Sequence, residues 1–435
     1  MSTRSRLSGL LCALLVIPVS GWSQQISSTP NEVLTLDQAI ALALRQNHGV
    51  RDEEMETGKT GDKVDVSRTL RLPSINVFAL ATDQFIKPEQ AIPGNTVTNN
   101  IFPGVGPFFS IGVPRRPTAV VAGLILQPLS QQYRFSLTIK QARLAQGAEK
   151  ERLRLVKQST IDRVKQTYYG ILETESSLES IEETIASYRE LDRLTSDQVA
   201  QEVKLKSAGL DVKTRLAKAE YEELNLANEL ATKKESLNKL LGRNVRTDFR
   251  LNPAPDVNGF PADLEGARSR ALEQRPEIRE AKLHIQEAEV DRRIKKSEYI
   301  PDVSAGFTYM TFRNFDEFVP KNLASAGFGI AWEVFDWGRK RGQLAEKDKA
   351  IDQARERLRE AEDSVLVDVS QKFRQLQQTR QTFVVAQLAK ETARENLRVN
   401  TSKYRLTAAY LSDVLQSQST LAEANYHYQQ ALLGY

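Results

Sequence analysis

The sequence contains few of the residues that enzymes and metal sites require. Its single cysteine is Cys12, and its three histidines are His48, His284 and His427. We interpret each histidine as lacking a second histidine or a carboxylate at the helical spacing of zinc ligands, and we expect it to be packed or solvated. No phosphate-binding loop, serine-hydrolase elbow or metalloprotease motif occurs. We therefore predict no enzyme activity, no catalytic residue, no bound metal and no cofactor.

A strong charge of one sign is also absent. Lysine and arginine number 60 against 56 aspartates and glutamates, and no dense basic tract occurs, which argues against nucleic acid as a partner. Charges of both signs alternate in stretches such as residues 149–152 and 355–360. This alternation is typical of solvated helix faces.

The N-terminal apolar run is short. Arg4 and Arg6 precede an apolar stretch at residues 10–19, and small residues follow at 20, 21 and 23. This pattern predicts a secretory signal peptide, residues 1–23, cleaved after Gly21 or Ser23. The stretch is too short to span a bilayer. Because Cys12 would leave with this segment and no cysteine follows it, we expect a mature chain without disulfides or a lipid anchor.

A long duplication organises the remaining sequence. Residues 36–47 recur as residues 264–275, and at the same displacement residues 73–75 recur as residues 301–303. In each copy a short helix, a longer helix, a proline and a β-like hairpin precede a long helical tract. We predict two tandem structural repeats, residues 24–250 and 251–435, joined by a proline-rich linker near residues 252–261.

The long tracts predict two helical hairpins, at about 131–242 and about 337–433. Apolar residues recur every seven positions at Val164, Ile171, Leu178 and Ile185, and again at Leu344, Ile351, Leu358 and Val365. A helix over the first tract would be on the order of 95 Å long. We expect the first reversal at residues 207–209, where glycine allows the turn, and the second at residues 406–409. A coiled-coil rod is the alternative.

Two shorter segments, about 74–129 and about 302–336, predict β-hairpins. In the second, larger apolar residues alternate with residues 302, 304, 306, 308 and 310, which we interpret as a small or polar face. This alternation favours transmembrane strands with lipid outside and water inside, whereas a soluble hairpin is the alternative. Four strands cannot close a barrel, so identical chains would supply eight strands in a dimer or twelve in a trimer, and the larger barrel can hold a water channel.

One strand connection, residues 87–116, is rich in proline and glycine and much longer than its counterpart at 314–322. Because outer-membrane barrels place their long loops outside, we predict an extracellular loop. It either covers part of the pore or is mobile without a gating role.

Several motifs together carry a resemblance to a known family. They are residues 34–44, 72–73, 240–242, 300–301, 334–341 and 411–415. In their order and spacing the chain resembles the outer membrane efflux protein family, the TolC-like channels of tripartite pumps and type I secretion. The resemblance implies a mainly α fold with a transmembrane β part. It implies a homotrimer in which a twelve-stranded β-barrel in outer membrane lipid continues as a long periplasmic α-helical barrel.

The resemblance also implies a function. The chain would be a passive exit channel for small molecules or proteins, working with a periplasmic adaptor protein and an inner-membrane transporter. Drugs, metal ions, siderophores and proteins all remain open as cargo. The alternative is a periplasmic coiled-coil adaptor or structural protein without a membrane pore.

The same resemblance assigns candidate site residues. A periplasmic gate would include Asp413, Asp211, Tyr404 and Gln416. Adaptor-contacting tips would include Gly209, Leu210, Val212, Leu411, Val414 and Leu415. The sequence departs from the family where Gln416 replaces a second aspartate and Ala409 replaces an arginine that would pair with Asp211. The alternative for Asp413 is a helix N-cap without a gating role.

Overall fold

The computed structural model describes residues 33–83, 117–202, 205–252, 263–314, 320–406 and 408–434. The expected signal peptide, the segment 87–116 and most of the proline-rich linker lie outside these residues. None of the described helices combines the length and the apolar character needed to cross a bilayer.

The described elements follow the same succession twice. The helices are α1 (Leu36–Gln46), α2 (His48–Thr69), α3 (Gln132–Ala200), α4 (Lys206–Leu241), α5 (Leu264–Gln274), α6 (Pro276–Ser297), α7 (Arg339–Arg405) and α8 (Leu411–Gly434). The strands are β1 (Val33–Leu34), β2 (Ser74–Thr82), β3 (Thr118–Pro128), β4 (Arg250–Leu251), β5 (Asp302–Arg313) and β6 (Asn322–Ala331). We call α1–α4 with β2 and β3 the first unit, and α5–α8 with β5 and β6 the second unit.

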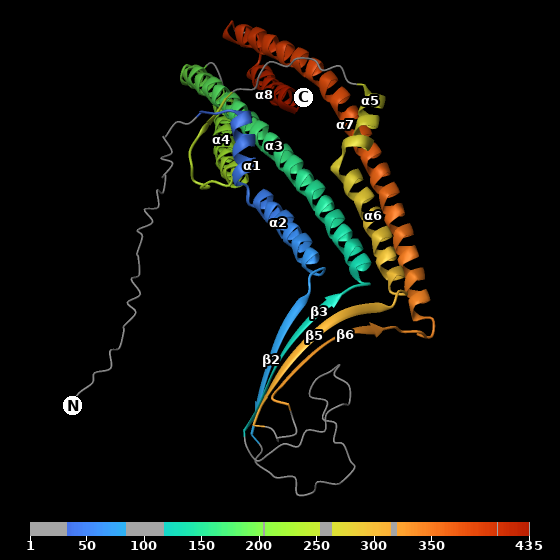
Figure 1. Cartoon of the computed structure of the whole chain (residues 1–435). Coiled ribbons are helices and arrows are strands. Elements are labelled where there is room, and N and C mark those ends of the chain that lie inside the picture. Colours follow the sequence, from blue (N-terminus) through green and yellow to red (C-terminus); the bar gives the residue numbers. More distant parts are fainter. Residues whose placement is uncertain are drawn as a thin grey trace, which may run out of the picture.

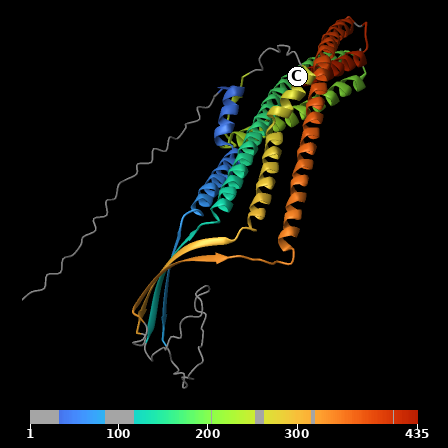
Figure 2. The same cartoon turned by 45° about the vertical axis from the view of Figure 1, so that its right-hand side comes forward.

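The sheet and the helical part lie at opposite ends of an elongated molecule (Figures 1 and 2). The four long strands form one antiparallel sheet in the order β2-β3-β5-β6. Strands β3 and β5 join the two units, with Val121 opposite Thr311. The short strands β1 and β4 pair separately, in parallel.

The two faces of the sheet differ in exposure. Phe328 and Ile330 on β6 are 80% and 73% exposed, so large apolar side chains stand on an open face. On β5, however, Met310 and Phe312 are buried in a cluster with Ala122. Interpreting the alternate positions of β5 as uniformly small or polar was therefore wrong at Met310. Its side chain packs against the neighbouring strand.

The last strand is shorter than the predicted hairpin of residues 302–336. Strand β6 ends at Ala331 because the chain then turns toward α7. The Glu333 carboxylate pairs with Arg339 and Lys340 at 2.6 and 3.3 Å, and the Asp336 carboxylate accepts hydrogen bonds from the Gly338 and Lys340 N–H groups. These contacts stabilise the first turn of α7, so the chain continues as a helix and β6 does not extend to residue 336.

The N-termini of several helices are set by local sequence. A capping box at Thr35 and Gln38 starts α1, the Asn47 side chain caps α2, and Pro276 occupies the first turn of α6. In α3 the predicted heptad residues Val164, Ile171 and Ile185 are buried, and Leu178 is partly buried. The spacing therefore identified the packed face of this helix.

One buried cluster joins α1 to α3 and α4. Its members are Leu34, Ala39, Ala43, Val164, Tyr168, Ile171, Leu237, Leu241 and Phe249. The Tyr168 hydroxyl lies 3.1 Å from the Leu34 carbonyl oxygen and 2.8 Å from that of Asn252, at the short β1–β4 sheet. Burial raises the pKa of this tyrosine.

The first helical reversal differs from the expectation. Helix α3 ends at Ala200, Glu202 has a left-handed backbone with φ of 61°, and α4 already begins at Lys206. Gly209 therefore lies inside α4 and does not make the turn. The left-handed conformation that usually follows a helix end is supplied by a glutamate, a residue that sequence reasoning does not expect there.

Candidate gate at the hairpin tips

The two helical hairpins, α3 with α4 and α7 with α8, bring their tips together at the end of the molecule farthest from the sheet (Figure 1). One apolar cluster, which we call the tip cluster, joins all four helices. Its buried members are Ile185, Tyr188, Leu191, Val212, Ala219, Tyr404, Leu411, Val414 and Leu415. The tips of one chain are therefore held to each other by apolar burial.

Tyr404 is the polar link between the two hairpins. Its side chain is 2% exposed within the tip cluster, and its hydroxyl donates a hydrogen bond to the Gln198 side-chain oxygen at 2.9 Å. Because Gln198 lies in α3 and Tyr404 in α7, this bond crosses from one hairpin to the other. Sequence reasoning named Tyr404 but missed Gln198, since no sequence pattern relates two residues so far apart.

Asp413 lies exposed in the first turn of α8. Its carboxylate accepts the N–H of Tyr410 at 3.2 Å, which satisfies a backbone group at the start of the helix. The Asp413 carbonyl oxygen accepts a hydrogen bond from the Ser417 hydroxyl, and Ser417 in turn accepts one from Asn400 of α7. Asp413 is thus the third residue of α8, not its N-cap, and it contributes a capping contact to the residue before the helix while its side chain stays exposed.

The other two candidate gate residues are also on the surface. Asp211 in α4 and Gln416 in α8 are exposed. Within the described part of the chain, the Asp211 side chain forms neither a hydrogen bond nor an ion pair. Nearby in α3, hydrogen bonds from Arg193 to Glu190 hold the pKa of the Glu190 carboxyl below its usual range. The tip surface thus carries several ionised groups beside the apolar cluster.

The candidate adaptor-contacting residues divide by burial. Leu210 is 58% exposed, and Gly209 is partly exposed. The side chains of Val212, Leu411, Val414 and Leu415 are instead buried in the tip cluster. These four apolar residues hold the two hairpins of the chain together and are not presented on its surface.

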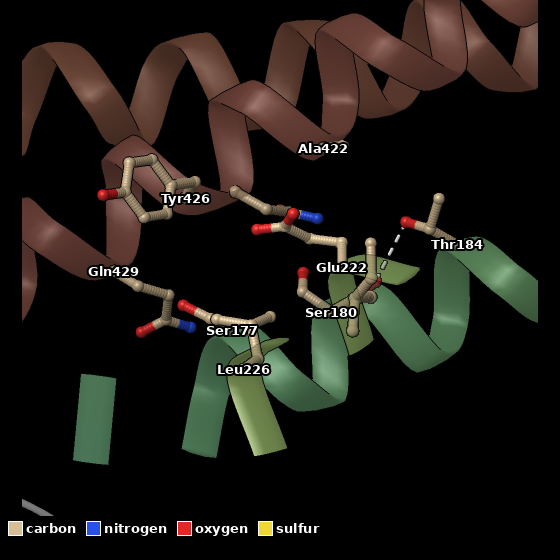
Figure 3. Close-up of a pocket in the computed structure, with 10 residues that line it drawn as sticks. Ser177, Ser180, Thr184, Glu222, Leu226, Ala422, Tyr426 and Gln429 are labelled. Carbon is tan, nitrogen blue, oxygen red and sulfur yellow. Dashed lines mark hydrogen bonds between the residues drawn. The ribbon is translucent and has the colours of Figure 1, made fainter. Parts of the chain in front are cut away.

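A seam with a cavity lies between the hairpins, beyond the tip cluster. The cavity has a volume of about 210 Å³ and lies between α3, α4 and α8. Its surface is mostly apolar, with hydroxyl and amide groups at Ser177, Ser180 and Gln429 beside apolar residues such as Leu226 and Tyr426 (Figure 3). The Thr184 hydroxyl bonds back to its own helix, to the Ser180 carbonyl oxygen at 2.9 Å. A second pocket, between α3, α7 and α8, shares Ser180, Asn425 and Gln429. The hairpins are therefore packed tightly at the tip and less tightly along this seam.

Two histidines have carboxylate neighbours that the sequence interpretation overlooked. Nδ1 of His284 lies 3.2 Å from Glu287, and Nε2 lies 3.7 Å from Glu280, while Nε2 of His427 lies 3.9 Å from Glu423. Carboxylates at helical spacing are thus present, which corrects the interpretation of isolated histidines. Even so, no group of three or more potential ligands within the described ranges could hold a metal ion.

A comparison with family models now identifies the chain. The model for the outer membrane efflux protein family matches residues 39–243 and 267–433. The chain belongs to the outer membrane efflux protein family. The two matched ranges cover most of both units, and the resemblance predicted from the sequence motifs is confirmed.

Solved structures with the same fold include outer membrane proteins. An outer membrane protein of Vibrio cholerae, VceC, is 14% identical over 92% of each chain with a TM-score of 0.74. A membrane protein of Pseudomonas aeruginosa is 16% identical over 93% of this chain and 88% of its own, with a TM-score of 0.78. The Campylobacter jejuni outer membrane channel CmeC is 12% identical over 92% and 83%, with a TM-score of 0.72. No curated protein is close enough in sequence to match.

Proposed function

We propose that the chain is a passive outer-membrane exit channel that works as a homotrimer, with twelve strands in the membrane and a helical barrel in the periplasm. The observation that carries the proposal is an open four-stranded sheet at one end of a long helical body. Strands β2 and β6 are its two edges, each paired on one side only within the described residues. An open edge is not tolerated in lipid, so further copies must close the sheet.

The exposed apolar side chains support a membrane location for the sheet. Ile75 and Val77 on β2 and Phe328 and Ile330 on β6 are each 69% exposed or more. Strands of nine to twelve residues match the length needed to cross the hydrocarbon core when tilted. Eight strands would give a barrel filled by its own side chains, whereas twelve leave room for water.

The helical body supports a conduit through the periplasm. Helices α3 and α7 contain 69 and 67 residues. Each would be about 100 Å long at 1.5 Å per residue. We propose that the units correspond to two tandem repeats, residues 24–250 and 251–435, and that three chains place six helical hairpins around one tunnel.

The hairpin tips would then form the periplasmic end of the tunnel. We assign the gate to Asp413, Asp211, Tyr404 and Gln416. The Tyr404–Gln198 hydrogen bond would hold the two hairpins of a chain in a closed arrangement, and Asp413 would supply charge to the opening. The partly exposed Gly209 and the exposed Leu210 are the candidates for contact with a periplasmic adaptor, which would connect the channel to an inner-membrane transporter. That transporter would select the cargo.

Cysteine cross-linking tests the trimer directly. The only cysteine is Cys12, so a chain without the expected signal peptide has no background thiol. Ala79→Cys on β2 combined with Ala326→Cys on β6 places one thiol on each edge strand, on the same face of the sheet. Oxidation in outer membranes should produce covalent dimers and trimers, and scanning positions two residues away on the same face, Val77 and Ala324, should locate the register.

An internal pair provides the control for that experiment. Val121 and Thr311 face each other on adjacent strands of the same chain, so Val121→Cys with Thr311→Cys should give only intrachain bonds. Native mass measurement in mild detergent should give a trimer, and planar bilayers should show conductance. A monomer without conductance that washes out of membranes with carbonate would instead support the alternative of a periplasmic adaptor or structural protein.

A further inference from the structure

The interface between α2 and α3 contains an arrangement that none of the channel features explains. Glu53 of α2 is 14% exposed at its side chain, and Glu149 of α3 lies within hydrogen-bonding reach of it. The Oε1 atoms of both carboxyl groups are buried, and neither receives a hydrogen bond from a described residue. Two carboxylates cannot bond to each other without a proton, so the pair is satisfied only when one of them is protonated.

We propose that Glu53 and Glu149 share one proton across the α2–α3 interface, which makes this joint in the first unit sensitive to pH. With the proton present, one carboxyl group donates a hydrogen bond to the other and both buried oxygens gain a partner. Without it, two negative charges face each other in a partly buried position. Helix α2 then binds α3 less tightly.

The surrounding charges do not remove the need for this proton. Nε of Arg152, on α3, lies 3.4 Å from the Glu53 carboxylate but is not aligned to donate a hydrogen bond. Helix α2 also places Asp52, Glu56 and Lys59 near the pair. The adjacent Glu151 of α3 faces Arg279 of α6 at 3.9 Å.

The electrostatic balance agrees with a shared proton near neutral pH. The hydrogen bond with Glu149, followed by burial, raises the pKa of Glu53 to about 7, while Arg152 acts in the opposite direction. Since the folded group binds its proton more tightly than an unfolded glutamate, the stabilising effect is complete below pH 4.5 and is lost as the pH rises through 7.

The second unit lacks this arrangement. Counted from the first residue of each helix, Ala281 of α6 takes the place that Glu53 has in α2. The interface of α6 with α7 is joined by opposite charges, through Lys347 with Asp291 at 2.9 Å and through Arg292 with Asp348. Protons are not needed to satisfy these pairs.

Hydrogen exchange of the full-length protein at about pH 5.5 and about pH 8.5 tests the shared proton, after correction for intrinsic exchange rates. Exchange of α2 amides should become about thirtyfold faster at the higher pH, because a pKa of about 7 in place of 4.5 corresponds to about 1.5 logarithmic units of stability between these two pH values. Exchange of α6 amides should not change. In Glu53→Gln the amide donates permanently to Glu149, so α2 should be protected equally at both values.

A matched variant and an independent signal complete the test. Glu54→Gln removes the neighbouring carboxylate, which pairs with Lys157 at 2.7 Å, and should keep the wild-type pH response. Infrared difference spectra should show a protonated carboxyl band that titrates near neutral pH and is lost in Glu53→Gln or Glu149→Gln. If α2 of the wild type exchanges equally at both pH values, the pair does not share a proton. The same conclusion follows if Glu53→Gln and Glu149→Gln both keep the wild-type pH response.

Discussion

Helix α1 of the first unit is buried, whereas α5, which has the same length and place in the second unit, is not. Ala39 and Ala43 of α1 are completely covered, but the matching Ala267 and Ala271 of α5 are only partly buried. The difference arises from the return helices. Helix α4 packs against α1, whereas α8 packs against α3 and α7.

The contacts made by each helix reflect this difference. The Asn47 side chain after α1 donates to the Leu240 carbonyl oxygen of α4 at 2.8 Å. Helix α5 is attached to α7 by polar side chains instead, since Arg268 donates to Ser370 at 2.8 Å and Arg275 pairs with Asp368 at 2.5 Å. Similar sequences thus form an apolar core in one unit and a partly buried polar contact in the other. Whether the short helix becomes buried depends on whether the return helix of its unit packs against it.

The largest effect is expected at the two left-handed glycines. Gly242 ends α4 with φ of 69°, and an added Cβ would lie 2.1 Å from the backbone oxygen of Gln46. Gly338 starts α7 with φ of 84° but has open space around it. Gly242→Ala should lower the free energy of unfolding by roughly 3 kcal/mol or more, and Gly338→Ala by about 1 kcal/mol. Denaturation followed by circular dichroism measures both; equal losses would show that the α1–α4 contact is unimportant.

The two short helices themselves give the next largest contrast. Ala39→Leu forces a larger side chain into a fully buried site and should cost about 1–3 kcal/mol of unfolding free energy. Ala267→Leu places the same group on partly exposed α5 and should change it by less than about 0.5 kcal/mol. The same denaturation experiment compares the pair. A larger loss for Ala267→Leu would mean that another surface covers α5.

A smaller effect is expected where the two units meet at the tip. Tyr404→Phe removes the hydrogen bond to Gln198 and should cost about 1 kcal/mol. If the hairpins form a gate, single-channel recordings should also show more frequent opening. Tyr188→Phe is the matched control, because Tyr188 lies in the same cluster and its hydroxyl bonds to no described residue. Equal opening by both variants would remove the gating role of this bond.

The smallest structural effect, but a clear electrical one, is expected at Asp413. Asp413→Asn keeps an oxygen for the Tyr410 N–H while removing the charge, so the tip should remain folded. If three copies line the constriction, cation preference and block by multivalent cations should both decrease. Asp413→Ala should also lower cation preference and multivalent block, and it additionally removes the hydrogen bond from the Tyr410 N–H. Gln416→Asp should instead raise cation preference and multivalent block.

The matched change in the first unit is Asp211→Asn, which tests whether both units contribute charge to the opening. Reversal potentials and block by a multivalent cation measure the response. Unchanged values in the Asp413 and Gln416 variants would place these residues away from the constriction. A response at Asp211 alone would assign the charge to the first unit.

Much of the element order could be predicted from the sequence because it depends on local signals. The duplicated motif located α1 and α5, proline preceded both hairpins, and three of the four predicted heptad residues of α3 are buried. Family membership followed from the same ordered motifs. These signals act within a few residues, or between copies of one pattern, so a single sequence is sufficient to detect them.

Tertiary structure decided which candidate residues are available and which groups need a proton. Val212 and Leu415 resemble surface residues of a tip in sequence, yet four helices meet over them. Glu53 resembles any glutamate on a solvated helix until Glu149 is placed against it from a helix far along the chain. Burial and ionisation depend on distant neighbours, and local sequence carries no information about which helix will lie opposite.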